Sequence, residues 1–164
     1  MAKVPTCRRF HRICEDFTLC VNIGEGGYIL AEHPDERYTI FYYALYGSGK
    51  IGKIFESDFI LIETKKLTDV REYIKSEVIF QAHEDFCLIG FNTMDKNIHW
   101  NARILDKNTK VVKENKKSIL ICLDGEMIVN DKKFKRYHYA SLVVGNEYNL
   151  DLNENSVVVV FTQI

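Results

Sequence analysis

The chain has 164 residues, which is enough for one ordinary domain or two small ones. Its apolar fraction of 46% and charged fraction of 27% are those of a globular protein, so the composition excludes a disordered chain. The net charge of −1 excludes a general attraction to nucleic acid or to an anionic membrane, and no apolar run approaches the roughly 20 residues of a membrane-spanning helix.

The first half of the chain reads mainly as short strands. Residues 1–16 are basic and irregular, and they predict either a solvated arm or a strand that docks on a neighbour. The glycines at 24–27 predict a turn rather than a phosphate-binding loop, because the chain continues beyond them as a strand and not as a helix. Segment 67–75 has apolar residues at helical spacing and predicts the one short helix. Strands are predicted at 17–23, 28–31, 38–46, 50–54, 58–63, 78–82 and 86–92.

The second half continues in the same way. Its predicted strands are 98–105, 110–112, 118–123, 127–130, 134–139, 141–144, 148–152 and 157–162. Asp124-Gly125 lies between two apolar runs, and this pattern predicts a hairpin with a type I′ turn. Short strands at such regular spacing indicate an all-β fold, and about eight strands per half is the number found in a jelly roll.

The two halves of the sequence echo each other. Gly47 and Gly125 end similar apolar runs at an offset of 125 − 47 = 78 residues, and Glu77 and Glu147 begin similar segments at an offset of 147 − 77 = 70. The difference between the two offsets, 78 − 70 = 8, predicts about that many extra residues in the first copy around 57–74. We therefore predict an internal duplication, with a first jelly-roll unit and its N-terminal arm in residues 1–95 and a second unit in residues 96–164.

Three runs of the second half suggest a family. They are Ile-Leu-Ile-Cys-Leu-Asp-Gly-Glu-Met-Ile-Val-Asn at 119–130, Ala-Ser-Leu-Val-Val-Gly-Asn-Glu-Tyr-Asn-Leu at 140–150, and Val-Val-Val-Val-Phe at 157–161. This order of strand, glycine turn, short strand, loop and closing strand resembles the cupins, which are small double-stranded β-helix barrels. A weaker copy covers residues 17–92, so the whole chain resembles a tandem bicupin.

The resemblance does not extend to the metal motifs of the cupins. At the positions of the two histidines and the glutamate of the first motif, the second unit has Lys113, Asn115 and Ser118, and at the histidine of the second motif it has Tyr148. The first unit has Asp35, Arg37, Ile40 and Val78 at the corresponding positions. A cupin metal needs several imidazole or carboxylate ligands in one barrel. We therefore expect no metal and no other cofactor.

Both strand faces are apolar in the central strands 40–46 and 118–124. A strand with two apolar faces is covered on both sides, so we expect the other unit or another subunit to cover the outer face. A homo-oligomer is one way to provide that cover. The alternative is a flattened sandwich without a partner.

Tyrosines and lysines are the candidate ligand-binding residues. We expect them at Tyr42, Tyr46, Lys113, Ser118 and Tyr148. The basic run at 132–136, beside an aromatic residue, indicates either a solvated strand edge or a place where a phosphate is held while a ring stacks. No nucleophile elbow or triad motif is present, so no catalytic residue is predicted and enzymatic activity is left open, with the balance against it.

Three functions remain open from the sequence. The first is a metal-free, cupin-like protein that binds a small ligand, such as a nucleotide-like or other anionic metabolite. The second is a cupin-type isomerase, epimerase or lyase, and the third is a structural or assembly protein that uses the barrel as a scaffold. The five cysteines, an odd number without a CxxC pair, indicate reduced thiols and so predict a cytoplasmic location.

Overall fold

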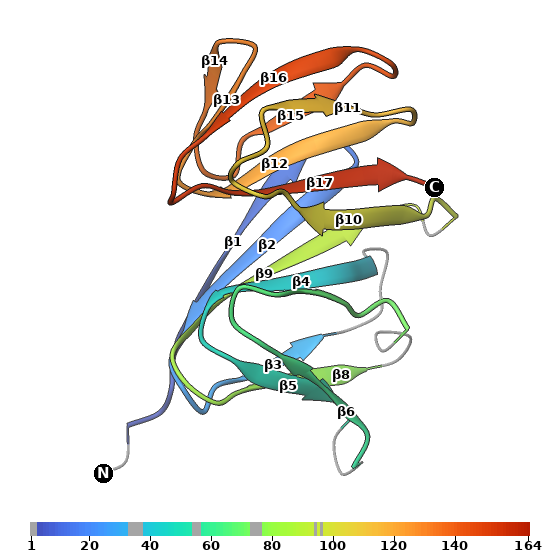
Figure 1. Cartoon of the computed structure of the whole chain (residues 1–164). Coiled ribbons are helices and arrows are strands. Elements are labelled where there is room, and N and C mark those ends of the chain that lie inside the picture. The colour runs from blue at the N-terminus through green and yellow to red at the C-terminus, as the bar shows by residue number, and fades with distance from the viewer. Residues whose placement is uncertain (1–2, 33–37, 54–56, 73–76, 94, 96) are drawn as a thin grey trace. The chain divides into compact units, whose positions relative to one another are not determined.

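The computed structural model describes residues 3–32, 38–53, 57–72, 77–93, 95 and 97–164 (Figure 1). These residues form 17 strands and no helix. The chain divides into two compact units, Met1–Asp95 and Lys96–Ile164, and each is described by itself. In the part of the chain that the structure describes, no helix is long and apolar enough to cross a membrane.

The first unit has two antiparallel sheets. The five-stranded sheet has the order β1 (Cys7–Cys14), β2 (Phe17–Gly24), β9 (Phe86–Thr93), β4 (Tyr38–Tyr46) and β7 (Leu67–Asp69). The four-stranded sheet has the order β3 (Ile29–Glu32), β8 (Val78–Ala82), β5 (Gly49–Gly52) and β6 (Phe59–Ile62). The basic N-terminal segment is therefore a strand, because β1 pairs with β2 along its whole length.

The second unit has two four-stranded antiparallel sheets. One has the order β10 (Trp100–Ile104), β17 (Val157–Gln163), β12 (Ser118–Asp124) and β15 (Tyr139–Leu142). The other has the order β11 (Val111–Lys113), β16 (Glu147–Leu152), β13 (Met127–Val129) and β14 (Lys132–Phe134). Two facing sheets of this kind make a jelly roll.

Strand pairing corresponds residue for residue between the units. Phe41 lies opposite Phe91 in the first unit, and Ile119 lies opposite Phe161 in the second, so the offsets of 78 and 70 are those found in the sequence. In both ladders one shift of register falls just before the corner glycine. A duplicated unit would produce this match, while common origin of the two halves stays a prediction.

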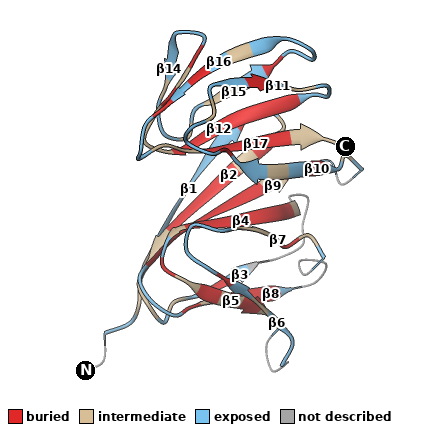
Figure 2. Cartoon of the chain, viewed as in Figure 1, coloured by how far each residue is buried: buried red, intermediate tan, exposed pale blue. Residues whose placement is uncertain are grey.

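Each unit has its own apolar core. Alternate residues of the strands point inward, and in the second unit these include Leu120 and Cys122 of β12, Leu150 of β16 and Val160 of β17. In the first unit the corresponding layer contains Tyr42, Phe80 and Leu88. Figure 2 shows that β4 and β12 are buried along most of their length, and the buried residues include both alternating sets.

The short helix predicted near residues 67–75 is wrong for the part that is described. Residues 67–69 form β7, which pairs with β4, and the Val70 N–H continues this pairing by donating to the carbonyl of Ile40 at 2.9 Å. Residues 73–75 lie outside the described residues. A segment this short gains too little from helical propensity alone, and its β-branched Thr68 and Val70 suit an extended backbone beside β4.

The hairpin predicted at Asp124-Gly125 is also wrong. Strands β12 and β13 on either side of this pair do not pair with each other but belong to different sheets, so the pair forms a corner between sheets. The tight hairpin comes six residues later. Asn130 and Asp131 have φ values of 47° and 66° and connect β13 to β14 in two residues, as a type I′ turn requires. The strand predicted at 134–139 is interrupted by a turn at residues 136–137.

Candidate functional site

The predicted ligand residues of the first unit do not meet at one place. Tyr42 is almost fully buried within the apolar core. Tyr46 is 45% exposed at the end of β4, where it lies opposite Cys87. Tyr42 therefore belongs to the packing of the core, whereas Tyr46 lies at the surface.

The predicted residues of the second unit are also separated. Lys113 is exposed on β11, while its neighbour Val112 belongs to the barrel core and lies opposite Tyr148. Ser118 is buried at the start of β12, where its hydroxyl donates to the carbonyl of Lys116 at 2.9 Å. Tyr148 lines a groove that includes neither Lys113 nor Ser118.

The described parts of the barrel interiors are lined mainly by apolar side chains. Apolar side chains fill the second barrel, including Leu120 and Cys122 beside the Ser118 position, and Val78 belongs to the packed core of the first. Asp35 and Arg37 lie outside the described residues. The described residues contain no group of three His, Cys, Asp or Glu side chains that could hold a metal ion. At the described motif positions, which are Ile40, Val78, Lys113, Asn115, Ser118 and Tyr148, no carboxylate or imidazole is present.

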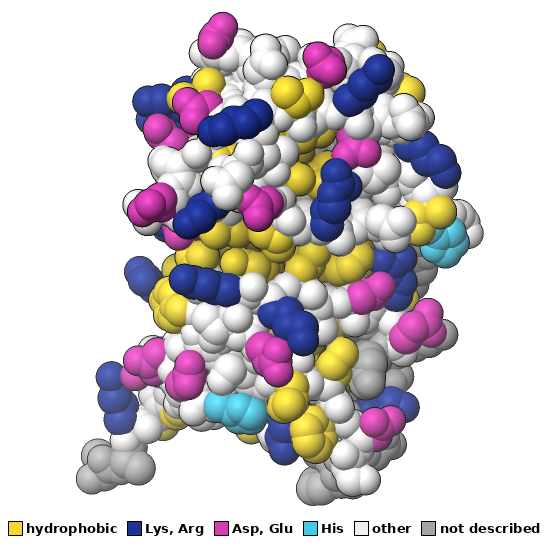
Figure 3. All heavy atoms as spheres, in the orientation of Figure 1, with side chains coloured by type: hydrophobic (Ala, Val, Ile, Leu, Met, Phe, Trp, Pro, Cys, Tyr) yellow, Lys and Arg dark blue, Asp and Glu magenta, His cyan; other side chains and the backbone are white. Residues whose placement is uncertain are grey.

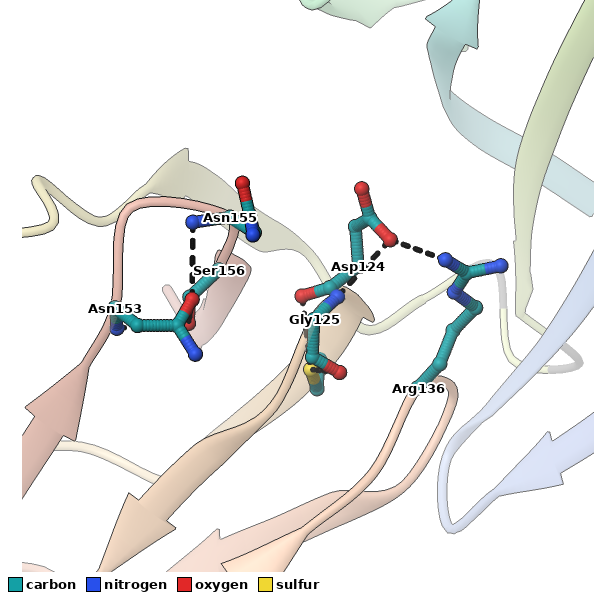
Figure 4. Close-up of polar contacts among 7 residues, drawn as sticks. Asp124, Gly125, Arg136, Asn153, Asn155 and Ser156 are labelled. Carbon is teal, nitrogen blue, oxygen red and sulfur yellow. Dashed lines mark hydrogen bonds and ion pairs between the residues drawn. The ribbon is translucent and has the colours of Figure 1, made fainter.

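The corner after β12 is a closely packed structural site (Figure 4). The carboxylate of Asp124 accepts hydrogen bonds from the guanidinium of Arg136 and, at 2.9 Å, from the backbone N–H of Gly125. The hydroxyl of Ser156 donates to the carbonyl of Glu126 at 2.6 Å and so ties the adjacent turn to the corner. These contacts hold the corner and leave Arg136 paired with a carboxylate.

A groove of about 400 Å³ lies along the open edge of the second barrel. Its walls come from β14 and β15, which are the edge strands of the two sheets, together with the neighbouring β13, the β13–β14 turn and β16. This volume is within the range of small-molecule sites. The lining residues are Val129, Asn130, Lys132, Phe134, Tyr139, Ala140, Ser141 and Tyr148.

The floor of the groove is aromatic and rests on the core. Phe134, Ala140 and Tyr148 are half-buried and pack against the apolar cluster of the barrel. Their inward orientation follows from strand alternation, since Tyr148 is in phase with Leu150 on β16. Ring faces in this position offer a platform on which a flat ligand can lie.

Lys132 is the cation of the groove. Its ammonium lies 5.3 Å from the centre of the Phe134 ring. Of its basic neighbours, Lys133 lies 3.6 Å from the carboxylate of Glu126, and Arg136 pairs with Asp124. Among the described residues, no carboxylate forms an ion pair with Lys132, so its charge is available to a ligand.

The corresponding positions of the first unit are apolar. Pairing and offset place Ile60 where the second unit has Lys132, Ile62 where it has Phe134, and Val78 where it has Tyr148. Ile62 and Val78 belong to the core of the first unit. The polar groove is therefore a feature of the second unit and not a consequence of the barrel architecture that the units share.

Shifted titratable groups lie away from the groove. Burial raises the pKa of the Cys14 thiol and of the Cys122 thiol to about 11, and it also raises the pKa of Cys7. Hydrogen bonds from Thr6 lower the pKa of the exposed Glu25 carboxylate. None of these four residues lines the groove. All five cysteines are free thiols.

Sequence reasoning found part of this groove. Tyr148 was among the predicted ligand residues, and Lys132 belongs to the basic run noted beside an aromatic residue. Phe134, Asn130 and Tyr139 were missed, because only the pairing of β13 with β14 and of β12 with β15 brings them together. The Asn-Asp pair between short strands was the signal that could have found the turn.

No protein-family model matches the chain, and no curated protein matches its sequence. Solved structures do match. A conserved protein of unknown function from Pseudomonas aeruginosa PAO1 is 8% identical, with 97% of this chain and 88% of that chain covered and a TM-score of 0.65. HutD from Pseudomonas fluorescens SBW25 is 10% identical, with 98% and 100% covered and a TM-score of 0.60.

A cupin 2 conserved barrel domain protein from Leptotrichia buccalis is 13% identical, with 99% of this chain and 91% of that chain covered and a TM-score of 0.46. Identities this low show a likeness of fold alone. The chain shares its all-β fold with HutD and with the conserved protein from Pseudomonas aeruginosa PAO1, and the cupin family stays what the sequence resembles.

Proposed function

We propose that this cupin-like protein binds a small anionic metabolite in the groove of its second unit, through its own side chains. A nucleotide-like molecule suits the groove, because a ring can lie on Phe134 while its phosphate meets Lys132. The proposal concerns binding, and the groove lining contains no His, Asp, Glu or Cys side chain.

One observation carries the proposal. In the second unit a lysine without a carboxylate partner lies over an aromatic ring beside a groove, where the first unit has isoleucines. A barrel that served only as a scaffold would gain stability from isoleucine at these positions, as the first unit does. The polar residues of the groove therefore indicate a ligand.

The charge of the second unit supports an anion. Residues 96–164 contain 11 Lys and Arg against 8 Asp and Glu, a net charge of +3, while residues 1–95 contain 11 against 15, a net charge of −4. Figure 3 shows the two signs interspersed over the face in view. The excess is thus distributed, and the unpaired Lys132 provides the local attraction at the groove.

Calorimetric titration with uridine 5′-monophosphate and with uridine tests this function. We expect the nucleotide to bind more tightly than the nucleoside. Lys132→Ala should weaken nucleotide binding about three- to tenfold and leave nucleoside binding nearly unchanged, because it removes a charge-assisted contact to the phosphate.

Lys133→Ala is the matched control, since it removes the same charge one residue away from a side chain that pairs with Glu126. It should leave nucleotide affinity close to that of the wild type. Equal losses from Lys132→Ala and Lys133→Ala would show a diffuse charge effect and would contradict a site in the groove. No binding of either ligand, or of inorganic phosphate, would also contradict the proposal.

A scaffold function is the second candidate, and the filled barrel interiors favour it. Under this alternative the chain acts as an assembly protein through its surface contacts rather than through the groove. The homo-oligomer expected from the sequence is compatible with both ligand binding and a scaffold function. Native mass spectrometry of the purified protein gives the subunit count and any co-purified mass together, and a bound mass of a few hundred daltons would favour ligand binding.

A further inference from the structure

Two polar side chains of the groove already form hydrogen bonds within the protein. The phenolic oxygen of Tyr148 accepts a hydrogen bond from the backbone N–H of Val143 at 2.8 Å. A phenol has one O–H donor, and its oxygen is the acceptor. The oxygen already accepts the Val143 N–H, and the O–H hydrogen can be donated to a ligand.

Asn130 also forms a hydrogen bond with the backbone through its side chain. Its carbonyl oxygen Oδ1 accepts the backbone N–H of Asn149 at 2.8 Å, across the hairpin turn. This bond fixes which end of the amide is the oxygen, and it occupies one of the two lone pairs of that oxygen. The amide NH₂, a donor of two hydrogens, is left on the other side.

Lys132 adds a third donor. An ammonium has three hydrogens and no acceptor, and in the described residues no carboxylate pairs with this one. The hydroxyls of Tyr139 and Ser141 can act as donor or acceptor, and the remaining lining residues are apolar. Three of the five polar side chains of the groove therefore present donors, and none is an anion.

We infer that the groove selects acceptor-rich ligands, in which a flat ring carries an anionic group at one end and a hydrogen-bond acceptor such as a carbonyl at the other. This inference rests on the proposed function and names the chemical class of its ligand. Lys132 holds the anion, while Tyr148 and Asn130 distinguish an acceptor from a donor on the ring. A donor placed against these groups would leave two donors facing each other without partners, which costs affinity.

Three phenyl phosphates provide the test. They share the ring and the phosphate and differ only at the para position, which is an acetyl group as acceptor, hydrogen as reference, or an amino group as donor. In titrations followed by NMR, we expect 4-acetylphenyl phosphate to bind about three- to tenfold more tightly than 4-aminophenyl phosphate, with phenyl phosphate between them.

Two variants address the side chains. Tyr148→Phe should reduce the ratio of acetyl to amino affinity, a change of selectivity that a general loss of packing would not produce. Asn130→Asp keeps an oxygen for the Asn149 N–H and a residue type that tolerates positive φ, but replaces the donor by an anion. It should lower the affinity for all three phosphates and lower the acetyl preference.

The outcomes separate this inference from the proposed function. Equal affinity for the acetyl and amino compounds, with binding that still depends on Lys132, would overturn donor selection and leave anion binding intact. A preference that Tyr148→Phe and Asn130→Asp leave unchanged would also overturn it. Failure of all three phosphates to bind, together with failure of uridine 5′-monophosphate, would instead overturn the proposed function.

Discussion

Replacement of the corner glycines by alanine tests how the strands pass from one sheet to the other. Gly125 has a φ of 66°, and a Cβ at this position would lie 2.9 Å from the carbonyl oxygen of Asn155. Gly47 has a φ of 81°, and its Cβ would lie 2.6 Å from Cα of Phe86. Gly145 also has a φ of 81°, but nothing lies within 4 Å of its Cβ.

These three positions separate two costs. Positive φ alone costs alanine about 1–2 kcal/mol, so this is the loss expected for Gly145→Ala. At the corners the added methyl group also meets backbone, which must shift, and overpacking of this kind costs about 1–3 kcal/mol more. We expect Gly125→Ala to lose about 2–5 kcal/mol and Gly47→Ala to lose at least as much, because the contacts of its Cβ are closer.

Urea denaturation followed by fluorescence and circular dichroism measures these losses. The two probes should be compared first, because two units can unfold in separate steps and a single free energy then has no meaning. If Gly145→Ala is as destabilising as the two corner variants, close backbone approach contributes nothing and the reasoning about the corners is refuted.

Three further predictions follow from the second unit and its cysteines. The double variant Lys132→Ile, Tyr148→Val, which installs the residue types of the first unit, should abolish binding of uridine 5′-monophosphate and leave the urea midpoint unchanged or higher; a lower midpoint would contradict the correspondence between the units. Asp131→Gly should raise the free energy of unfolding by about 0.5 kcal/mol, because glycine adopts the positive φ of a type I′ turn without strain. Thermal denaturation measures this change, and a lower melting temperature than that of the wild type would contradict the prediction. The raised pKa of Cys122 means that the folded state holds the thiol proton more tightly than the unfolded state, whose thiol titrates near 9.0, so this stabilisation is complete below pH 9 and is lost as pH rises to about 11. Stability measured across this window should fall more steeply for the wild type than for Cys122→Ala, and equal slopes would contradict the burial of this thiol.

Much of the fold could be predicted because strands leave strong local signals. The apolar run at 38–46 gave the bounds of β4, and the two offsets matched the pairing of β4 with β9 and of β12 with β17. The errors came from features that depend on partners. Residues 67–75 have helical spacing, but a strand beside β4 decides their conformation. The Asp124-Gly125 pair has the sequence of a hairpin, but each flanking strand finds better partners in a different sheet.

The candidate site was harder to predict because its residues come from both sheets of a barrel. Tyr148 was singled out by its place in a motif, and the groove beside it depends on Phe134 and Lys132, which are 14 and 16 residues away in the sequence. For the other predicted ligand residues, the alternation of inward and outward side chains along each strand determines burial. Lys113 is exposed because its neighbour Val112 takes the inward position, and Tyr42 is buried because the first barrel needs its ring for packing. The ligand role of these residues stays a prediction.

The positions of β9 and β17 have a consequence for how the protein folds during synthesis. Each is the last strand of its unit, yet each lies inside its sheet, β9 between β2 and β4 and β17 between β10 and β12. Neither main sheet can therefore complete its strand pairing until its final strand has left the ribosome. Until then, the strands that flank it have unpaired edges. The first unit can complete its sheet while the second is still being synthesised. Removal of residues 157–163 would delete an interior strand and disrupt the second unit, which trimming of a loose terminus would not do.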